Sequence, residues 1–115
     1  MKISEIASLL GANIMCCEDM CDNEVFSACG SDMMSDVLAY VKHQAVLLTG
    51  LVNPQVIRTA EMMDMHCIVF VRNKIPSEEM LLLAKEAGIV VMATPKRMFE
   101  ACGILYDGGL APKGE

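Results

Sequence analysis

The feature that most constrains the fold is a unit that occurs three times in the second half of the chain. In each unit a short apolar run ends in a polar turn and leads into a helix opening. The runs are residues 45–49, 67–71 and 89–93, and the helix openings are residues 53–56, 76–79 and 94–97. Runs without polar alternation are typical of strands buried on both faces, as in a parallel sheet. Strand, turn and helix in series therefore predict an α/β domain with right-handed crossovers.

The first half of the chain lacks this repeated unit and predicts a helix followed by two short strands. Apolar residues at helical spacing indicate a helix over 3–10 that stops at Gly11. Residues 13–17 and 24–29 are each consistent with a short strand, separated by an acidic turn. Ser31 is a suitable N-cap for the next helix, with Asp32 in its first turn.

The boundaries of the last helices follow from capping residues. Asn53 can cap a helix that starts at Pro54, and Gly88 can close the following one. The final helix is predicted to begin at Thr94–Pro95 and to pack Met98, Phe99, Cys102 and Tyr106. Residues 1–109 then form one mostly parallel, three-layer α/β/α domain, and residues 110–115 a frayed tail.

Composition excludes several functional classes. The net charge of −6 argues against nucleic-acid binding, which requires a basic face. The longest apolar run is far shorter than the roughly 20 residues that span a membrane, and the acidic start of the chain is unlike a signal peptide. We therefore expect a cytoplasmic protein, whose six cysteines remain thiols.

The turns that follow the strands contain the candidate ligand-binding residues. Because the carboxyl ends of parallel strands meet at one edge, these turns should lie together and favour a phosphorylated small molecule or nucleotide. The predicted ligand-binding residues are Thr49, Gly50, Asn53, Arg72, Thr94 and Pro95. Ser31, Asp32 and Ser35 join them if the strand before them is parallel. The alternative is that Asn53 and Thr94 only cap helices and Gly50 only permits a tight turn.

Residues suited to other chemistry are few. Four cysteines, at positions 16, 17, 21 and 29, invite a metal or iron–sulfur interpretation, but their spacing matches neither zinc nor ferredoxin motifs. His43 and His66 each precede a predicted strand, at the edge opposite the candidate site. No Walker loop, dinucleotide-binding motif or nucleophile elbow occurs. The sequence thus predicts neither an enzyme nor a bound cofactor.

One segment carries a family resemblance. Residues 30–38, GSDMMSDVL, resemble the G-x-S-D-L-L-S-D-V-M segment of small proteins with a DRTGG domain. The later stretches 48–50, 53–54, 68–71 and 93–95 are also similar, so that the resemblance covers almost the whole chain. The literal DRTGG string is absent, and only Thr49–Gly50 remains of it.

The resemblance implies a domain similar to the N-terminal domain of HPr kinase/phosphorylase. Related domains are regulatory and dimer-forming, and in regulated pyrophosphatases they help to hold an adenine-nucleotide effector. Stand-alone members are often encoded beside iron-only hydrogenase or redox-complex subunits, which implies an accessory role.

Three functional hypotheses follow. The first is a non-catalytic regulatory module, a homodimer, that binds a phosphorylated or nucleotide ligand. The second is an accessory factor that docks on a redox complex, without a small ligand, through exposed Met33, Met34, Met62 and Met63. The third is a metal or cluster carrier that uses the N-terminal cysteines.

Overall fold

The computed structural model describes residues 1–40 and 44–110 and contains one five-stranded sheet in the order β1-β5-β4-β3-β2. Strands β2 to β5 are parallel, and β1 pairs antiparallel with β5 through a register shift between Ile14 and Cys16. The strand bounds are β1 Asn13–Cys16, β2 Ser27–Gly30, β3 Ala45–Thr49, β4 Cys67–Phe70 and β5 Val90–Ala93. The mostly parallel α/β sheet expected from the three repeated units is therefore confirmed.

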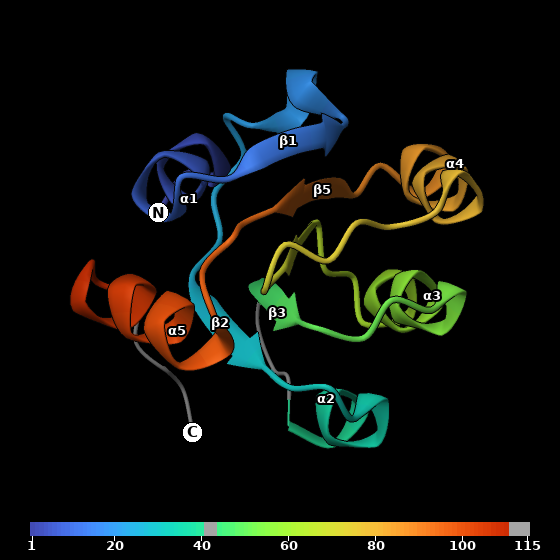
Figure 1. Ribbon diagram of the computed structural model, residues 1–115. Coiled ribbons are helices and arrows are strands. Elements are labelled where there is room, and N and C mark those ends of the chain that lie inside the picture. The colour runs from blue at the N-terminus through green and yellow to red at the C-terminus, as the bar shows by residue number, and fades with distance from the viewer. Residues whose placement is uncertain (41–43, 111–115) are drawn as a thin grey trace.

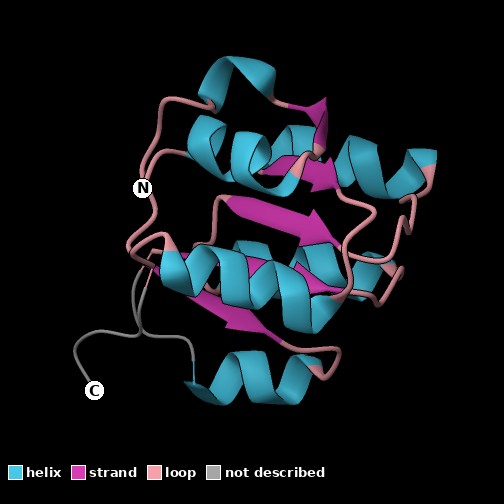
Figure 2. Cartoon of the chain, turned by 60° about the vertical axis from the view of Figure 1, so that its left-hand side comes forward, coloured by secondary structure: helices cyan, strands magenta, loops and turns pink. Residues whose placement is uncertain are grey.

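Helices cover both faces of this sheet (Figures 1 and 2). One layer contains α1 and α5, and the other contains α2, α3 and α4, which connect successive parallel strands. The helix bounds are α1 Ile3–Leu10, η1 Glu18–Met20, α2 Met34–Tyr40, α3 Pro54–Met62, α4 Glu78–Ala87 and α5 Met98–Asp107. Among the residues described, no helix combines the length and apolar character needed to cross a bilayer.

Each strand contributes to two hydrophobic clusters, one on either face of the sheet. Val46, Leu48 and Val69 pack with α1 and α5, whereas Leu47 and Ile68 pack with α2, α3 and α4. All residues of β3, β4 and β5 are buried. Side chains alternate between faces along a strand, so an apolar run without alternation fills both clusters.

The capping residues set several boundaries as the sequence predicted. The Asn53 side chain accepts a hydrogen bond from the Gln55 amide and begins α3, with Pro54 at its first position. Gly11 and Gly88 adopt left-handed conformations and end α1 and α4. Glycine is favoured at such a helix end because a residue with a Cβ is strained in the left-handed conformation.

The prediction for the last helix was wrong in two respects. It begins at Met98 instead of Thr94, because the backbone of residues 94–96 accepts hydrogen bonds from the loop after β4. Phe99 and Tyr106 are 93% and 63% exposed, although both were expected to be packed. Met98 and Cys102 do pack against the core as predicted, together with the fully buried Ala101 and Leu105, which lie one helical turn apart.

The structure also differs from the prediction in the first half of the chain and at its end. The second strand is shorter than expected, and α2 begins at Met34, so Ser31 and Asp32 lie in the preceding turn. Leu110, assigned to the tail, is buried, and its amide donates to the Leu105 carbonyl. His43 and residues 111–115 lie outside the described residues, and the division at 109 stays a prediction.

Thr94 ties the end of β5 to α1. Its hydroxyl is buried and donates a hydrogen bond of 2.7 Å to the carbonyl of Leu10, in the last turn of that helix. The same oxygen accepts a hydrogen bond from the Lys96 amide. A helix carbonyl without an intrahelical partner is thereby satisfied inside the protein.

Replacing Thr94 by valine should therefore destabilise the protein by about 1–3 kcal/mol, because the substitution leaves the Leu10 carbonyl buried without a partner. Chemical denaturation measures this change in the free energy of unfolding.

Thr59→Val is the matched control, since the buried Thr59 hydroxyl has no hydrogen-bond partner in the described part of the chain. That substitution should be neutral or stabilising, because it replaces an unpaired hydroxyl by a methyl group. Equal losses in the two variants would contradict the role assigned to Thr94.

Candidate functional site

The four parallel strands end at one edge of the sheet, which Figure 1 views with β2 and β3 ending toward the reader. Gly30, Thr49, Phe70 and Ala93 are the last residues of these strands. The loops that follow them carry most of the candidate ligand-binding residues. Ligands of parallel α/β sheets bind preferentially at this edge.

The loop after β4 is a tight turn with an unusual backbone. Arg72 and Asn73 have φ of 58° and 59°, and the Lys74 amide donates to the Val71 carbonyl. Positive φ is strained for arginine, and such strain persists only where surrounding contacts hold it. Those contacts come from the neighbouring loop: the Arg72 amide donates to the Lys96 carbonyl at 2.8 Å, and the Asn73 amide to the Thr94 carbonyl at 2.9 Å.

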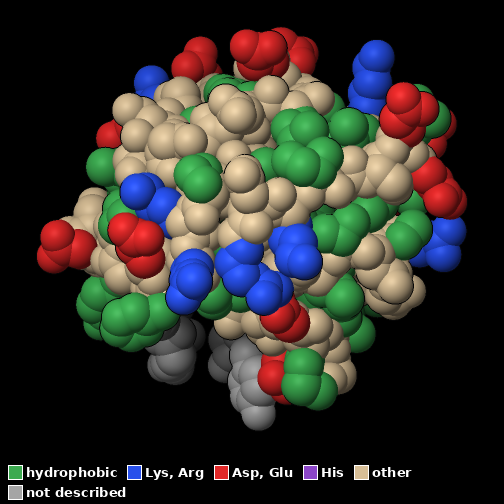
Figure 3. Space-filling model, viewed as in Figure 1, with side chains coloured by type: hydrophobic (Ala, Val, Ile, Leu, Met, Phe, Trp, Pro, Cys, Tyr) green, Lys and Arg blue, Asp and Glu red, His purple; other side chains and the backbone are tan. Residues whose placement is uncertain are grey.

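These two bonded loops concentrate positive charge. They carry Arg72, Lys74, Lys96 and Arg97, four of the nine Lys and Arg residues in the chain. We call these four residues the basic cluster. Figure 3 shows Lys and Arg side chains gathered near the centre of this face, with acidic side chains mostly around its rim. The only ion pair of the cluster, within the described residues, joins Lys96 Nζ to Glu100 Oε2 at 3.9 Å.

Gly50 fits closely against the Arg72 side chain. A Cβ at Gly50 would overlap the guanidinium group, with Cζ only 3.1 Å away. The close approach to Arg72 favours glycine at this position, whereas its backbone φ, which lies outside the left-handed region, does not require one. The absence of a side chain at position 50 therefore helps to set where the guanidinium of the basic cluster lies.

In the loop after β3, the backbone amide of Gly50 already donates a hydrogen bond to a carboxylate of the protein. Asp32 Oδ1 accepts hydrogen bonds from the Gly50 amide at 2.7 Å and from the Thr49 hydroxyl at 3.1 Å. The Thr49 oxygen in turn accepts from the Leu51 amide. The expected contact between this amide and a ligand anion is thus replaced by an internal carboxylate, and the basic cluster is left as the cationic part of this edge.

The predicted residues fall into two groups. Asp32, Thr49, Gly50 and Arg72 are brought together. The other predicted residues have separate roles or positions: Thr94 is buried against α1, Asn53 caps α3, Pro95 and Ser35 are exposed, and Ser31 fixes the turn before α2 by accepting from the Met33 amide.

Lys96 and Arg97 belong to the basic cluster, although the sequence prediction did not include them among the candidate residues. They follow β5 as Arg72 and Lys74 follow β4, so the same reasoning about strand ends would have found them. They were assigned to a helix opening because Pro95 is a common first helical residue. In the structure the helix starts later, which leaves both residues in the loop that bonds to Arg72.

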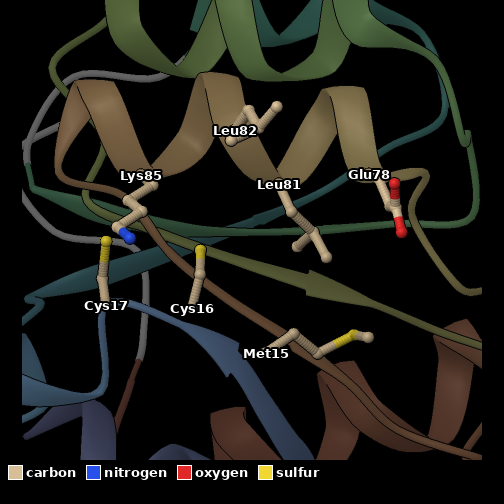
Figure 4. Close-up of a pocket in the computed structure, with 7 residues that line it drawn as sticks. All are labelled: Met15, Cys16, Cys17, Glu78, Leu81, Leu82 and Lys85. Atoms are coloured by element: carbon tan, nitrogen blue, oxygen red, sulfur yellow. The ribbon is translucent and has the colours of Figure 1, made fainter.

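A separate cavity of about 430 Å³ lies between β1 and α4 (Figure 4). Its lining residues are Met15, Cys16, Cys17, Glu78, Leu81, Leu82 and Lys85. Figure 4 shows the Lys85 amine beside the thiol of Cys17, with Glu78 at the other end of the helix. The Cys16 thiol donates to the Ile89 carbonyl at 3.3 Å. This hydrogen bond and the packing of the leucines account for the cavity wall as part of the folded structure.

The thiols are spread over several parts of the fold. Cys16 and Cys17 line the cavity, Cys21 is buried in the cluster beneath α1, and Cys29 lies on β2. In residues 1–40 and 44–110 no three His, Cys, Asp or Glu side chains form a group able to hold a metal. Burial raises the pKa of Cys16 to about 11, and burial also raises the pKa of the Cys29 and Cys67 thiols. These three groups are consequently neutral at physiological pH.

Comparison with known proteins gives two findings. The family described as the DRTGG domain matches residues 5–107. The fold is similar to the crystal structure of the CBS and DRTGG domains of the regulatory region of Clostridium perfringens pyrophosphatase, complexed with the activator diadenosine tetraphosphate. The TM-score is 0.74 at 18% sequence identity, and the alignment covers 90% of this chain and 45% of that chain. No similar sequence was found among curated proteins.

The raised pKa of Cys16 predicts a pH-dependent contribution to stability. Its thiol titrates at 9.0 when unperturbed and at about 11 in the folded state. The stabilising contribution is thus complete below about pH 9 and is lost as the pH rises toward about 11. The difference in unfolding free energy between the wild type and Cys16→Ala should shrink over this interval. Urea denaturation at pH 7.5, 9, 10 and 11 measures it, and a difference independent of pH would contradict the assignment.

Proposed function

This chain belongs to the DRTGG domain family, and from that premise we propose that it is a non-catalytic regulatory module that binds a phosphorylated small molecule or nucleotide. The site that we assign is the carboxyl edge of the sheet, centred on the basic cluster. The observation that carries this proposal is the concentration of Arg72, Lys74, Lys96 and Arg97 on two bonded loops of a chain whose net charge is −6.

Electrostatics explain why such a local concentration matters. An acidic protein repels phosphates at long range, so a local group of cations favours phosphate binding at that part of its surface. Arginine can hold a phosphate through two parallel hydrogen bonds, and lysine adds a point charge. The turn that holds Arg72 in a strained backbone conformation also keeps it hydrogen-bonded to the loop of Lys96.

The similar pyrophosphatase region supports the choice of ligand class. That region was crystallised with diadenosine tetraphosphate, a ligand with four linked phosphates and two bases. A domain with the same fold and a basic edge is suited to a ligand of similar chemistry. Transfer of the ligand to this chain is our proposal, because at 18% identity the likeness shows only the fold.

Binding at this edge would reach other parts of the domain through existing contacts. The loop that carries Lys96 begins at Thr94, whose hydroxyl binds the end of α1, and it continues into α5. A ligand that draws the two loops together would favour one arrangement of α1 and α5 over others. In a homodimer or a complex, that shift is the signal that a regulatory module transmits.

A second candidate function is docking on a larger protein, such as a redox complex of the hydrogenase type. Met33 and Met62 are exposed, as this hypothesis expects, whereas Met34 is buried and Met63 only partly exposed. Exposed methionines adapt to varied partner surfaces. Only two of the four methionines are thus exposed, and we rank this function below ligand binding.

Substitution of Arg72 by alanine should weaken the binding of ATP or inorganic tripolyphosphate at least about tenfold, because charge-assisted hydrogen bonds contribute about 1.5–3 kcal/mol. Isothermal titration calorimetry of the whole chain measures the affinity. Arg58→Ala, which removes the same charge from an exposed position on α3, is the control and should leave the affinity within about twofold. Equal losses in both variants would assign the effect to net charge alone.

Substitution of Gly50 by alanine tests the geometry of the site. The added methyl group would displace the flexible end of Arg72 and should weaken phosphate binding several-fold, with the free energy of unfolding changed by less than about 1 kcal/mol. Gly103→Ala is the control, because a Cβ at that position would have no neighbour within 4 Å and the substitution favours helix α5. Unchanged affinity in Gly50→Ala would remove this contact from the site.

A further inference from the structure

Phe99 is the most exposed large apolar side chain in the described part of the protein. Its ring is 93% exposed, whereas Phe70, in the centre of the sheet, is completely buried. An aromatic ring in water forgoes the favourable burial that such a side chain normally provides. Packing of α5 does not require a ring at this position, since Ala101 and Leu105 form its buried face.

The location of the ring links it to the basic cluster. Phe99 is the second residue of α5, and Arg97 immediately precedes that helix. Two virtual bonds separate the Cα atoms of Arg97 and Phe99, so they lie within about 8 Å of each other. Tyr106 is exposed on the same helix but lies seven residues further along, about 10 Å away along the helix axis.

Three of the residues near Phe99 in the sequence are charged. Lys96, Arg97 and Glu100 flank it, and Met98 is partly buried against the core. A protein-docking surface would instead surround an exposed ring with further apolar area. An exposed ring next to Lys96 and Arg97 is suited to a ligand with both a planar aromatic part and a phosphate part.

We propose that Phe99 stacks against the base of a nucleoside polyphosphate whose phosphates lie on the basic cluster. This inference rests on the proposed function and narrows the ligand class. A phosphorylated sugar or inorganic polyphosphate would contact the cations alone, whereas a nucleotide would also contact the ring. Phe99 therefore determines the preference for nucleotides, and Arg72, Lys74, Lys96 and Arg97 supply affinity for any polyphosphate.

The test compares ATP with inorganic tripolyphosphate by isothermal titration calorimetry on the whole chain. The wild type should bind ATP more tightly than tripolyphosphate. Phe99→Ala should weaken ATP binding about 5- to 150-fold, the range that loss of one aromatic stacking contact produces, and leave tripolyphosphate affinity unchanged. Phe99→Trp should retain ATP binding because it retains a stacking ring. Tyr106→Ala is the control for an exposed aromatic residue on α5 and should match the wild type.

The outcomes separate this inference from the proposed function. If the wild type binds neither compound, the basic cluster is not a phosphate site and both proposals fail. If the wild type binds both compounds and Phe99→Ala leaves ATP affinity unchanged, only the role of Phe99 fails. Sedimentation velocity provides a further check: a loss of self-association in Phe99→Ala with unchanged ATP affinity would identify the ring as a protein contact and overturn the inference.

Discussion

Burial of the central strands on both faces is the constraint on which the rest of this structure depends. Because β3, β4 and β5 face apolar layers above and below, their backbone groups must be satisfied by neighbouring strands. Pairing between strands does this, and the parallel direction of β2 to β5 places the loops that follow these four strands at the same edge. The loops at that edge are therefore the part of this chain where polar side chains can converge without disturbing the core.

Convergence at the edge is controlled by hydrogen bonds between loops as well as by topology. The Arg72 and Asn73 amides bond to the backbone of residues 94–96, and this contact delays the start of α5 to Met98. Lys96 and Arg97 consequently stay in the loop. Asp32 accepts from the neighbouring Gly50 amide and Glu100 pairs with Lys96, so two carboxylates accompany the four cations. The result is a local inversion of charge in an acidic protein, positioned by backbone contacts that do not depend on any ligand.

The layered α/β fold could be predicted from the sequence because the patterns that indicate it are local and repeated. Apolar runs, Asn53 before Pro54 and the terminal Gly88 each act within a few residues, and the structure follows them closely. Thr94–Pro95 misled the prediction because its partners are remote: the hydroxyl binds Leu10, and the carbonyl binds the Asn73 amide. The site prediction was similarly divided, since Arg72 and Gly50 meet as strand ends should, whereas the burial of Thr94 and the exposure of Phe99 arise from the tertiary packing of α1 and α5.

Thr94 also connects the loops of the basic cluster to a helical layer. Its carbonyl accepts from the Asn73 amide of the β4 loop, and its hydroxyl donates to α1. The hydroxyl oxygen also accepts from the Lys96 amide, so one buried residue contacts both loops of the basic cluster and the last turn of α1. A displacement of either loop must therefore alter a buried hydrogen bond, which is costly to leave unmade. These hydrogen bonds connect the edge of the sheet to α1, and residues 94–97 connect it to the start of α5.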